Sequence, residues 1–302
     1  MATTFTTPKK QLTFLITGCS SGFGLSLVGL AQAGGHTVIA TSRNPSKTPE
    51  LVKEVEIKGG KWIQLDVDSP DSSKVIEELE SSGQEIEYFT SLQTLNICLN
   101  NAGFSIFATV ETSTEEEIRS QMETMYFGPL RLIKAVLPYM RQRRFGIIVS
   151  MSSGASLSGA PTMGPYAGAK AGLDGMTKVL AKEVAAYNIR TLTVVLGTFN
   201  TSLGLNAIFG KIPLPEDYKQ TTAENMITWL KTGKVPINGD KDKAMKAVYD
   251  VVVGQGIGSG KEAEPLLLLG SDMVPRAKLV QDTLAHSLEV FGSFTNGVNI
   301  DK

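Results

Sequence analysis

Histidine and cysteine are scarce in this 302-residue chain, which has two of each. His36 and His286 are too few for a catalytic triad centred on histidine or for a zinc site built on it. The number and spacing of Cys19 and Cys98 suggest neither a disulfide framework nor a metal site. We therefore expect a protein of a reducing compartment that holds no metal.

Long apolar runs are also absent. No stretch of the sequence reaches the roughly 18 apolar residues of a membrane helix, and the polar start at residues 1–11 lacks the apolar core of a signal peptide. The formal net charge of −1 gives no bulk attraction to nucleic acid or to an anionic membrane. The basic cluster at residues 141–144 is typical of a helix end. These features predict a cytoplasmic protein with no nucleic-acid partner and no membrane insertion.

Apolar runs that alternate with helical stretches predict the fold. Such alternation is typical of an α/β protein with a Rossmann-type, doubly wound parallel sheet and helices on both faces. No repeat, low-complexity tract or linker divides the chain, so we expect a flexible segment at residues 1–10 and a single domain at 11–302. Strands are expected at residues 12–16, 36–41, 61–65, 95–99 and 145–151, with a buried last strand at 264–270 and a closing helix at 271–291.

A glycine-rich turn follows the first expected strand. The segment Thr17-Gly18-Cys19-Ser20-Ser21-Gly22-Phe23-Gly24 leads directly into a helical stretch that runs to about Ala33. Strand, glycine turn and helix together point main-chain N–H groups and a helix N-terminus at a pyrophosphate, which side chains would hold away. The pattern predicts a dinucleotide site, although a plain strand-to-helix turn has a similar composition.

Ser42 and Arg43 end the second expected strand. A dinucleotide site of this type places here an acidic residue for the ribose 2′-hydroxyl or an arginine for a 2′-phosphate. Because no acid is present, Arg43 favours NADP(H) over NAD(H), with Ser21 and Ser42 as extra donors to the phosphate. The alternative is that Arg43 is a solvated loop cation.

The third expected strand leads into Asp66-Val67-Asp68-Ser69-Pro70. Asp66 lies at the carboxyl edge of that strand, where it is placed to accept a hydrogen bond from an adenine amino group. Ser69 followed by Pro70 predicts a helix start that Asp68 or Ser69 caps.

A tyrosine and a lysine stand four residues apart in Tyr166-Ala167-Gly168-Ala169-Lys170. In a helix, the phenol and the ammonium lie on one face, one turn apart. The cation favours the phenolate, which suits this tyrosine to proton transfer in a partly dry site. Ser153 follows the strand at 145–151, at the sheet edge where ligands of open α/β sheets bind. Taken alone, the Tyr166 and Lys170 pair also fits an ordinary surface helix.

Four motifs in this order closely resemble the short-chain dehydrogenase/reductase family. They are the glycine turn at residues 17–24, Asn100-Asn101-Ala102-Gly103, Ser153, and Tyr166 with Lys170. The resemblance covers about residues 11–202. It implies a Rossmann-type oxidoreductase that uses NADP(H) to interconvert a carbonyl and a secondary alcohol.

The resemblance also implies a role for each matching residue. Tyr166 would be the general acid/base, Lys170 would hold the nicotinamide ribose and lower the phenol's pKa, and Ser153 would hydrogen-bond the substrate oxygen. The residues implied in cofactor binding are Gly18, Ser20, Ser21, Gly22, Phe23 and Gly24 at the pyrophosphate, Ser42 and Arg43 at the 2′-phosphate, Asp66 and Val67 at the adenine, Asn101, Ala102 and Gly103 at the ribose side, Tyr166 and Lys170, and Phe199 with Thr201 at the carboxamide.

Two positions depart from the family's pattern. Met125 stands where the family commonly has an asparagine that helps to hold a water behind the lysine, and a thioether is at best a weak acceptor. Leu196 stands where the family usually has a proline. Met125 leaves two alternatives open, namely a non-redox proton-transfer enzyme such as an isomerase or dehydratase, and a non-catalytic binding module.

Residues 202–236 are the lid over the substrate in the related family. The segment is apolar, with Ile208, Phe209 and Trp229 among its larger side chains. It favours a largely apolar small-molecule carbonyl or alcohol as substrate, although the same side chains also suit packing of the lid on the core. The family often pairs the helices expected at about 115–141 and 166–187 between subunits, which implies a homodimer or homotetramer.

Overall fold

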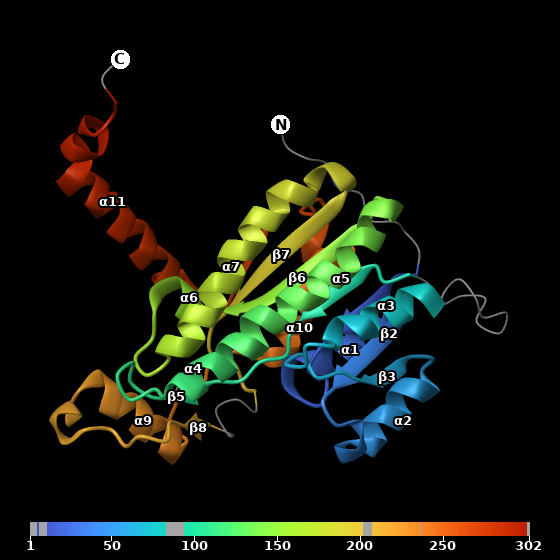
Figure 1. Ribbon diagram of the computed structural model, residues 1–302, viewed down its shortest axis with the longest axis horizontal. Helices are drawn as coiled ribbons and strands as arrows, with labels where there is room; N and C mark the ends of the chain where they lie inside the picture. Colours follow the sequence, from blue (N-terminus) through green and yellow to red (C-terminus); the bar gives the residue numbers. More distant parts are fainter. Residues whose placement is uncertain (1–4, 6–10, 83–93, 202–206, 236, 301–302) are drawn as a thin grey trace.

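A seven-stranded parallel sheet runs through the protein (Figure 1). The computed structural model describes residues 5, 11–82, 94–201, 207–235 and 237–300. Its strands are β1 (Thr13–Ile16), β2 (Thr37–Ser42), β3 (Lys61–Gln64), β4 (Ile97–Asn100), β6 (Gly146–Ser153), β7 (Ile189–Leu196) and β9 (Leu266–Leu269). The order β3-β2-β1-β4-β6-β7-β9 means that the chain builds outward from β1 to one edge and then crosses back to build the other half. The crossover lies between β1 and β4, where ligands of such sheets bind.

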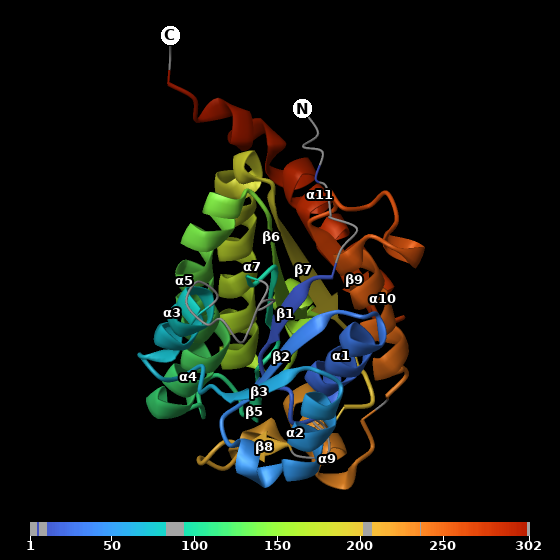
Figure 2. The same cartoon turned by 90° about the vertical axis from the view of Figure 1, so that its right-hand side faces the viewer.

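Helices cover both faces of the sheet because successive strand residues point to opposite sides. In β1, Phe14 and Ile16 pack into one buried cluster and Leu15 into another. Each such buried side chain contributes about 1.5–3 kcal/mol through the area removed from water. On one face lie α1 (Gly22–Ala33) and α10 (Lys241–Val253), and on the other lie α3 (Ser72–Ser82), α5 (Gly128–Arg143) and α7 (Gly164–Val184), as Figure 2 shows. The doubly wound α/β fold predicted from the sequence is confirmed.

The last strand differs from its prediction. The sequence predicts a buried strand at 264–270, but β9 forms the edge of the sheet and alternates in exposure, with Leu266 49% and Leu268 36% exposed. A run of leucines predicts burial on both faces, yet Leu267 and Leu269 are only half-buried and the other two leucines are exposed. The expectation of a buried strand is therefore wrong.

Two helices also begin or end away from their expected residues. The start predicted at Ser69 and Pro70 is a turn in which the Ser69 hydroxyl accepts from Asp71 N at 3.2 Å, and α3 begins at Ser72. The helix expected at 115–141 is α4 (Glu115–Met122) and α5, joined by a π-helical turn at Glu123–Phe127.

Several short elements carry little sequence signal. In α2 (Pro49–Ile57) Val55 is the one buried residue, so the helix shows little apolar periodicity. The strands β5 (Ile106–Phe107) and β8 (Ile208–Phe209) form a separate parallel pair next to α9 (Thr222–Thr232), and α6 (Gly154–Ser158) follows β6. The β5 and β8 pair, α9 and α6 lie at the end of the molecule where β4 and β6 reach their carboxyl ends (Figure 1).

The closing helix α11 (Met273–Gly297) is longer than expected and extends away from the rest of the protein (Figures 1 and 2). Its first residue, Met273, is buried, whereas Leu284, Leu288 and Phe291 are each more than half exposed. No helix in the described part of the chain is long and apolar enough to cross a membrane. Most of the expected flexible segment at 1–10, and residues 202–206 and 236 of the expected lid, lie outside the described residues.

The basic cluster at 141–144 is used for internal contacts. Arg143 forms a bidentate pair with the buried carboxylate of Glu80, at 2.8 and 3.1 Å, which ties the end of α5 to α3. Arg144 ends the helix in the left-handed conformation and donates to the Ala186 carbonyl at 2.6 Å. Two arginines of the cluster therefore stabilise the end of α5.

Candidate active site

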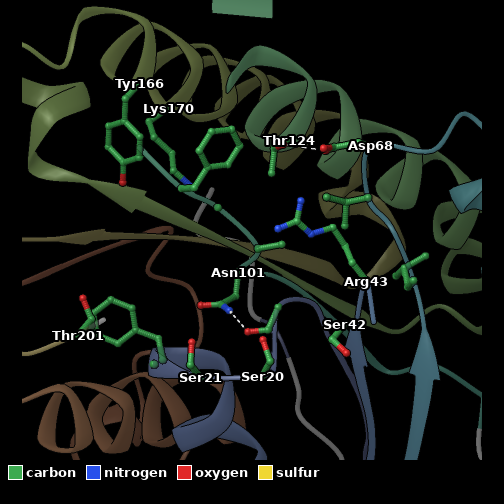
Figure 3. Close-up of a pocket in the computed structure, with 18 of the residues that line it drawn as sticks. Ser20, Ser21, Ser42, Arg43, Asp68, Asn101, Thr124, Tyr166, Lys170 and Thr201 are labelled. Carbon is green, nitrogen blue, oxygen red and sulfur yellow. Dashed lines mark hydrogen bonds between the residues drawn. The ribbon is translucent and has the colours of Figure 1, made fainter. Parts of the chain in front are cut away.

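A cavity of about 380 Å³ opens at the carboxyl edge of the parallel sheet. The turns that follow β1, β2, β3, β4, β6 and β7 each contribute to its wall, because parallel strands present their carboxyl ends at one edge. Figure 3 shows Tyr166 and Lys170 at one end of the cavity and Arg43 and Ser42 toward the other.

The glycine turn forms one wall of the cavity, and its close contacts explain why it needs glycines. Gly18 has a φ of +71°, and a Cβ added to it would lie 2.9 Å from the Cα of Ala102. A Cβ on Gly24 would lie 2.4 Å from the Gly18 carbonyl oxygen. Gly24 is buried and does not line the cavity, so its contribution is to let α1 approach the turn.

Asn101 fixes the glycine turn from the neighbouring strand. Its side-chain amide donates to the Thr17 carbonyl at 2.8 Å and to the Gly18 carbonyl at 3.2 Å. The Thr17 hydroxyl in turn accepts from the main-chain N–H groups of Asn101 and Ala102, both at 3.0 Å. The turn is therefore held rigidly, with its remaining N–H groups facing a cavity that fits a phosphate group.

Arg43 and Ser42 lie at the far end of the cavity from Tyr166 (Figure 3). Arg43 is exposed, and Ser42 is buried with its hydroxyl accepting from Trp62 Nε1 at 3.0 Å. A guanidinium and a hydroxyl next to the glycine turn are suited to bind a phosphate monoester. Ser20, Ser21 and Phe23 complete this part of the wall.

Two residues on the side of the cavity expected for the adenine were not identified from the sequence. Thr124, in the π-helical turn, donates to Asp68 at 2.7 Å, and both side chains line the cavity. Asp66 is exposed, does not line the cavity, and accepts from the N–H of Asp68 at 3.1 Å, whereas Val67 does line it. One of the two expectations, that Asp68 caps α3, is therefore wrong. Its position after a strand was visible in the sequence, but nothing there indicated Thr124 as its partner.

Tyr166, Lys170 and Ser153 come together at the other end of the cavity. Tyr166 and Lys170 lie one turn apart on α7, 8% and 4% exposed, and Lys170 Nζ is 5.9 Å from the centre of the Tyr166 ring. The Tyr166 hydroxyl shares a hydrogen bond with the side chain of Ser153. Ser153 caps α6 by accepting from Ala155 N at 3.2 Å. Ser153 itself is not part of the cavity wall, but its neighbour Ser152 is.

Burial governs the protonation of this pair. It raises the pKa of Tyr166, and the hydrogen bond with Ser153 acts in the opposite direction. Burial also lowers the pKa of Lys170 to about 8. Lys170 donates to the Met151 carbonyl at 2.7 Å. The lowering of the phenol's pKa by Lys170 that the family resemblance implies stays a prediction.

Met125 is fully buried next to the lysine. A Cβ added to Gly103 would lie 3.6 Å from Sδ of Met125 and 3.7 Å from Nζ of Lys170, so both side chains approach Gly103. Met125 packs in an apolar cluster with Tyr166 and Ala169. A thioether there has no proton to donate.

Three apolar residues also line the cavity, namely Phe104, Leu196 and Ile208, and Ile208 is 47% exposed. Thr201 is a further polar residue of the wall. Phe199 does not line the cavity and instead packs edge-on against Phe23, with ring centres 5.7 Å apart. Among residues of the expected lid, Leu230 is buried and Trp229 is 43% exposed.

The structure thus brings most of the predicted site residues to one cavity. Those in its wall are Gly18, Ser20, Ser21, Gly22, Phe23, Ser42, Arg43, Val67, Asn101, Ala102, Gly103, Tyr166, Lys170 and Thr201. Gly24, Asp66, Ser153 and Phe199 lie outside the wall. Among the described residues no group of three or more histidine, cysteine or acidic side chains is placed to hold a metal.

Comparisons with known proteins agree with this geometry. A family profile described as "short chain dehydrogenase" matches residues 12–207. The oxidoreductase claN of Passalora fulva is 36% identical over 190 residues, which are 63% of this chain and 83% of that protein. A 3-ketodihydrosphingosine reductase of Bacteroides thetaiotaomicron is 38% identical over 188 residues, which are 62% of this chain and 64% of that protein.

The fold has close counterparts among solved structures. A short-chain dehydrogenase from Streptomyces avermitilis superposes with a TM-score of 0.81 at 28% sequence identity. The match covers 97% of this chain and 100% of the other. The likeness therefore extends beyond the residues that the family profile matches.

Proposed function

The chain belongs to the short-chain dehydrogenase/reductase family and is an oxidoreductase, and we propose that it transfers a hydride between NADP(H) and a carbonyl or secondary alcohol of a largely apolar small molecule. The observation that carries this proposal is one cavity with Arg43 toward one end and Tyr166 with Lys170 at the other. An oxidoreductase that uses a dinucleotide needs its phosphate site and its proton-transfer site within one continuous cavity.

The residues of the cavity fit NADP(H). The glycine turn leaves room for the pyrophosphate, since Gly22 lines the cavity and the position of its missing side chain is open space. Arg43 and Ser42 would hold the 2′-phosphate, with Ser21 as a further donor. Val67, and Asp68 in place of Asp66, would border the adenine. Lys170 would hold the nicotinamide ribose, and Thr201 with the Phe199 main chain the carboxamide. When bound, the dinucleotide supplies or accepts the hydride.

Tyr166 is proposed to move the proton. In reduction its hydroxyl donates to the oxygen of the former carbonyl, and in oxidation its phenolate accepts the proton of the alcohol. Ser153 shares a hydrogen bond with Tyr166 and orients the same substrate oxygen. A fixed donor at a developing alkoxide contributes about 3 kcal/mol to lowering the barrier. The Lys170 ammonium favours the phenolate that the oxidation direction requires.

The substrate class follows from the apolar part of the cavity wall. Phe104, Leu196 and Ile208 line the same cavity as Tyr166 and make part of its wall apolar. The relative from Bacteroides thetaiotaomicron is named a 3-ketodihydrosphingosine reductase, which agrees with a ketone substrate here. The remaining predictions from the sequence, namely a single domain at 11–302, a substrate lid, a homodimer or homotetramer and a cytoplasmic location, stay part of this proposal.

The test is a titration of the purified protein with NADPH and with NADH, followed by cofactor fluorescence. A panel of apolar ketones is then added to the tighter complex while NADPH oxidation is measured. We expect ketone-dependent oxidation that Tyr166→Phe lowers by about 10²–10⁴-fold. The matched control is Tyr187→Phe, far from the cavity, which should leave the rate unchanged.

The outcomes separate the candidate functions. Binding of NADPH without oxidation of any ketone would favour the non-redox proton transfer that the Tyr166 and Lys170 pair also suits. Binding of neither cofactor would overturn the oxidoreductase proposal and favour a non-catalytic binding module.

A further inference from the structure

A carboxylate lies one helical turn beyond Lys170 on α7. Tyr166, Lys170 and Asp174 follow one another at intervals of four residues, so they share one face of the helix. Asp174 is half-buried, and its Oδ1 atom is buried without a hydrogen-bond partner in the described part of the chain. Burying a carboxylate costs free energy unless a hydrogen bond or an opposite charge compensates it.

Asp174 holds the turn that carries Ser153. Its Oδ2 atom accepts from the Ser156 hydroxyl at 2.7 Å. The same hydroxyl lies 2.7 Å from the main-chain carbonyl of Ser153, which is the alternative acceptor for its single proton, and 3.2 Å from the hydroxyl of Ser152, which can donate to it. Ser152 lines the cavity and Ser153 shares a hydrogen bond with Tyr166. The acid therefore fastens both serines to the helix that carries Tyr166.

Asp174 is also the anion that acts on Lys170. Its charge raises the pKa of the lysine, against the larger effect of burial. Burial raises the pKa of Asp174 itself, and the charges of Lys170 and Lys178 lower it. The Asp174 charge also raises the pKa of Tyr166. The charge of Asp174 therefore acts on both Tyr166 and Lys170.

Among the described residues, the charges that act on Lys170 and Asp174 are those of the two residues on each other and that of Lys178 on Asp174. Strand β6 presents the Met151 carbonyl to Lys170, the π-helical turn presents Met125, and α6 presents the Ser156 hydroxyl to Asp174. Helix α11 reaches α6, but the guanidinium of Arg276 is bound there to the Ser158 hydroxyl at 3.2 Å and to Asp272 at 3.4 Å. Asp174, one helical turn away, is thus the acid whose charge acts on the Lys170 ammonium.

We propose that Asp174 is a positioning residue for the Tyr166 and Lys170 pair. It acts through a hydrogen bond that anchors the Ser152–Ser156 turn to α7, and through a negative charge that stabilises the buried Lys170 ammonium. The proposal deepens the function proposed above and rests on it. Asp174 touches neither substrate nor cofactor in this scheme.

Two variants separate the hydrogen bond from the charge. Asp174→Asn keeps an oxygen that accepts from Ser156 and removes the charge. Ser156→Ala removes the hydrogen bond and keeps the charge. Asp282→Asn, on the exposed part of α11 where Asp282 pairs with Lys278, is a control with the same change in net charge.

The first measurement is the titration of Lys170 by NMR, which does not depend on activity. In protein labelled with ¹³C-lysine, the Lys170 resonance is assigned by its loss in Lys170→Arg. We expect Asp174→Asn to lower the titration midpoint by about one pH unit, because it removes an opposite charge close to the ammonium. Ser156→Ala and Asp282→Asn should leave it unchanged. An unchanged midpoint in folded Asp174→Asn would overturn the charge role.

The second measurement is the pH profile of kcat/KM with NADPH and a ketone. Asp174→Asn should move the basic limb to lower pH, since Lys170 then loses its proton earlier, and Ser156→Ala should lower kcat without moving the limb. If Asp174→Asn does not fold, Asp174→Glu should retain the wild-type midpoint by keeping the charge, and a lowered midpoint there would count against the proposal. If no ketone is reduced, the proposed function fails, while the NMR titration still decides the electrostatic role of Asp174.

Discussion

Asn101 donates two hydrogen bonds to Thr17, one from its side chain and one from its main chain. The Asn101 side-chain amide donates to the Thr17 carbonyl at 2.8 Å, and the Thr17 hydroxyl accepts from the Asn101 main-chain N–H at 3.0 Å. The turn after β1 and the turn after β4 therefore act as one unit at the crossover of the sheet. A phosphate site built from main-chain N–H groups depends on this rigidity.

Replacing Asn101 by alanine should loosen the glycine turn. The Thr17 and Gly18 carbonyls would lose their partner in a partly buried place, at a cost of about 1–3 kcal/mol in the free energy of unfolding. Urea denaturation measures that cost, and NADPH fluorescence measures the weaker binding that should accompany it. Asn296→Ala, on the exposed end of α11, is the control. Equal NADPH affinity in Asn101→Ala and wild type would contradict the role given to this contact.

Gly24 and Gly29 offer a matched pair on one helix, α1. An added methyl at Gly24 would lie 2.4 Å from the Gly18 carbonyl oxygen, which is main chain and cannot move without moving the turn. At Gly29 the same methyl would meet nothing within 4 Å. Gly24→Ala should therefore lower the melting temperature and NADPH affinity, whereas Gly29→Ala should stabilise the protein by about 0.5–1 kcal/mol. Destabilisation of similar size in both variants would show that the close approach is not the cause.

The sequence was sufficient to predict the fold where periodicity was strong. Strands such as β1 and β4 are short apolar runs buried on both faces, and the order of strands and helices determines the winding of the sheet. The sequence could not reveal the exposure of Leu266 and Leu268, because a run of leucines is equally compatible with a central strand and with an edge strand. It also could not reveal the π-helical turn at Glu123–Phe127, which adds no distinctive residue.

Within the site, motifs located the glycine turn and the Tyr166 and Lys170 pair. Contacts between distant segments were not visible. The Asp68 and Thr124 hydrogen bond joins residues 56 positions apart, and neither residue belongs to a motif. Asp174 has helical spacing to Lys170, but its bond to Ser156 depends on how α6 folds back on α7. Such pairs become evident only once the elements are placed together.

The two cysteines should be unreactive in the folded protein. Both Cys19 and Cys98 are buried, and burial raises the pKa of each thiol to about 12. Because the thiolate is the reactive form, raising the pH from 7 to 9 should leave both thiols protonated and should give little increase in labelling by a disulfide reagent. Labelling should become fast only in denaturant. Ser293→Cys on the exposed end of α11 is the positive control, and its labelling should rise with pH.

Arg43 should decide the choice between the two cofactors. Its exposed guanidinium lies in the cavity wall beside Ser42, where it would bind a 2′-phosphate that NADH lacks. Hydrogen bonds to a charged group contribute about 1.5–3 kcal/mol, so Arg43→Ala should weaken NADPH binding by about 10–100-fold and leave NADH binding nearly unchanged. The loss should shrink at high salt, because the site is open to solvent. Lys47→Ala, a nearby cation outside the cavity wall, controls for the general loss of positive charge. Equal weakening of both cofactors by Arg43→Ala would mean that the arginine stabilises the turn rather than the phosphate, and the preference for NADP(H) would then have to rest on other residues.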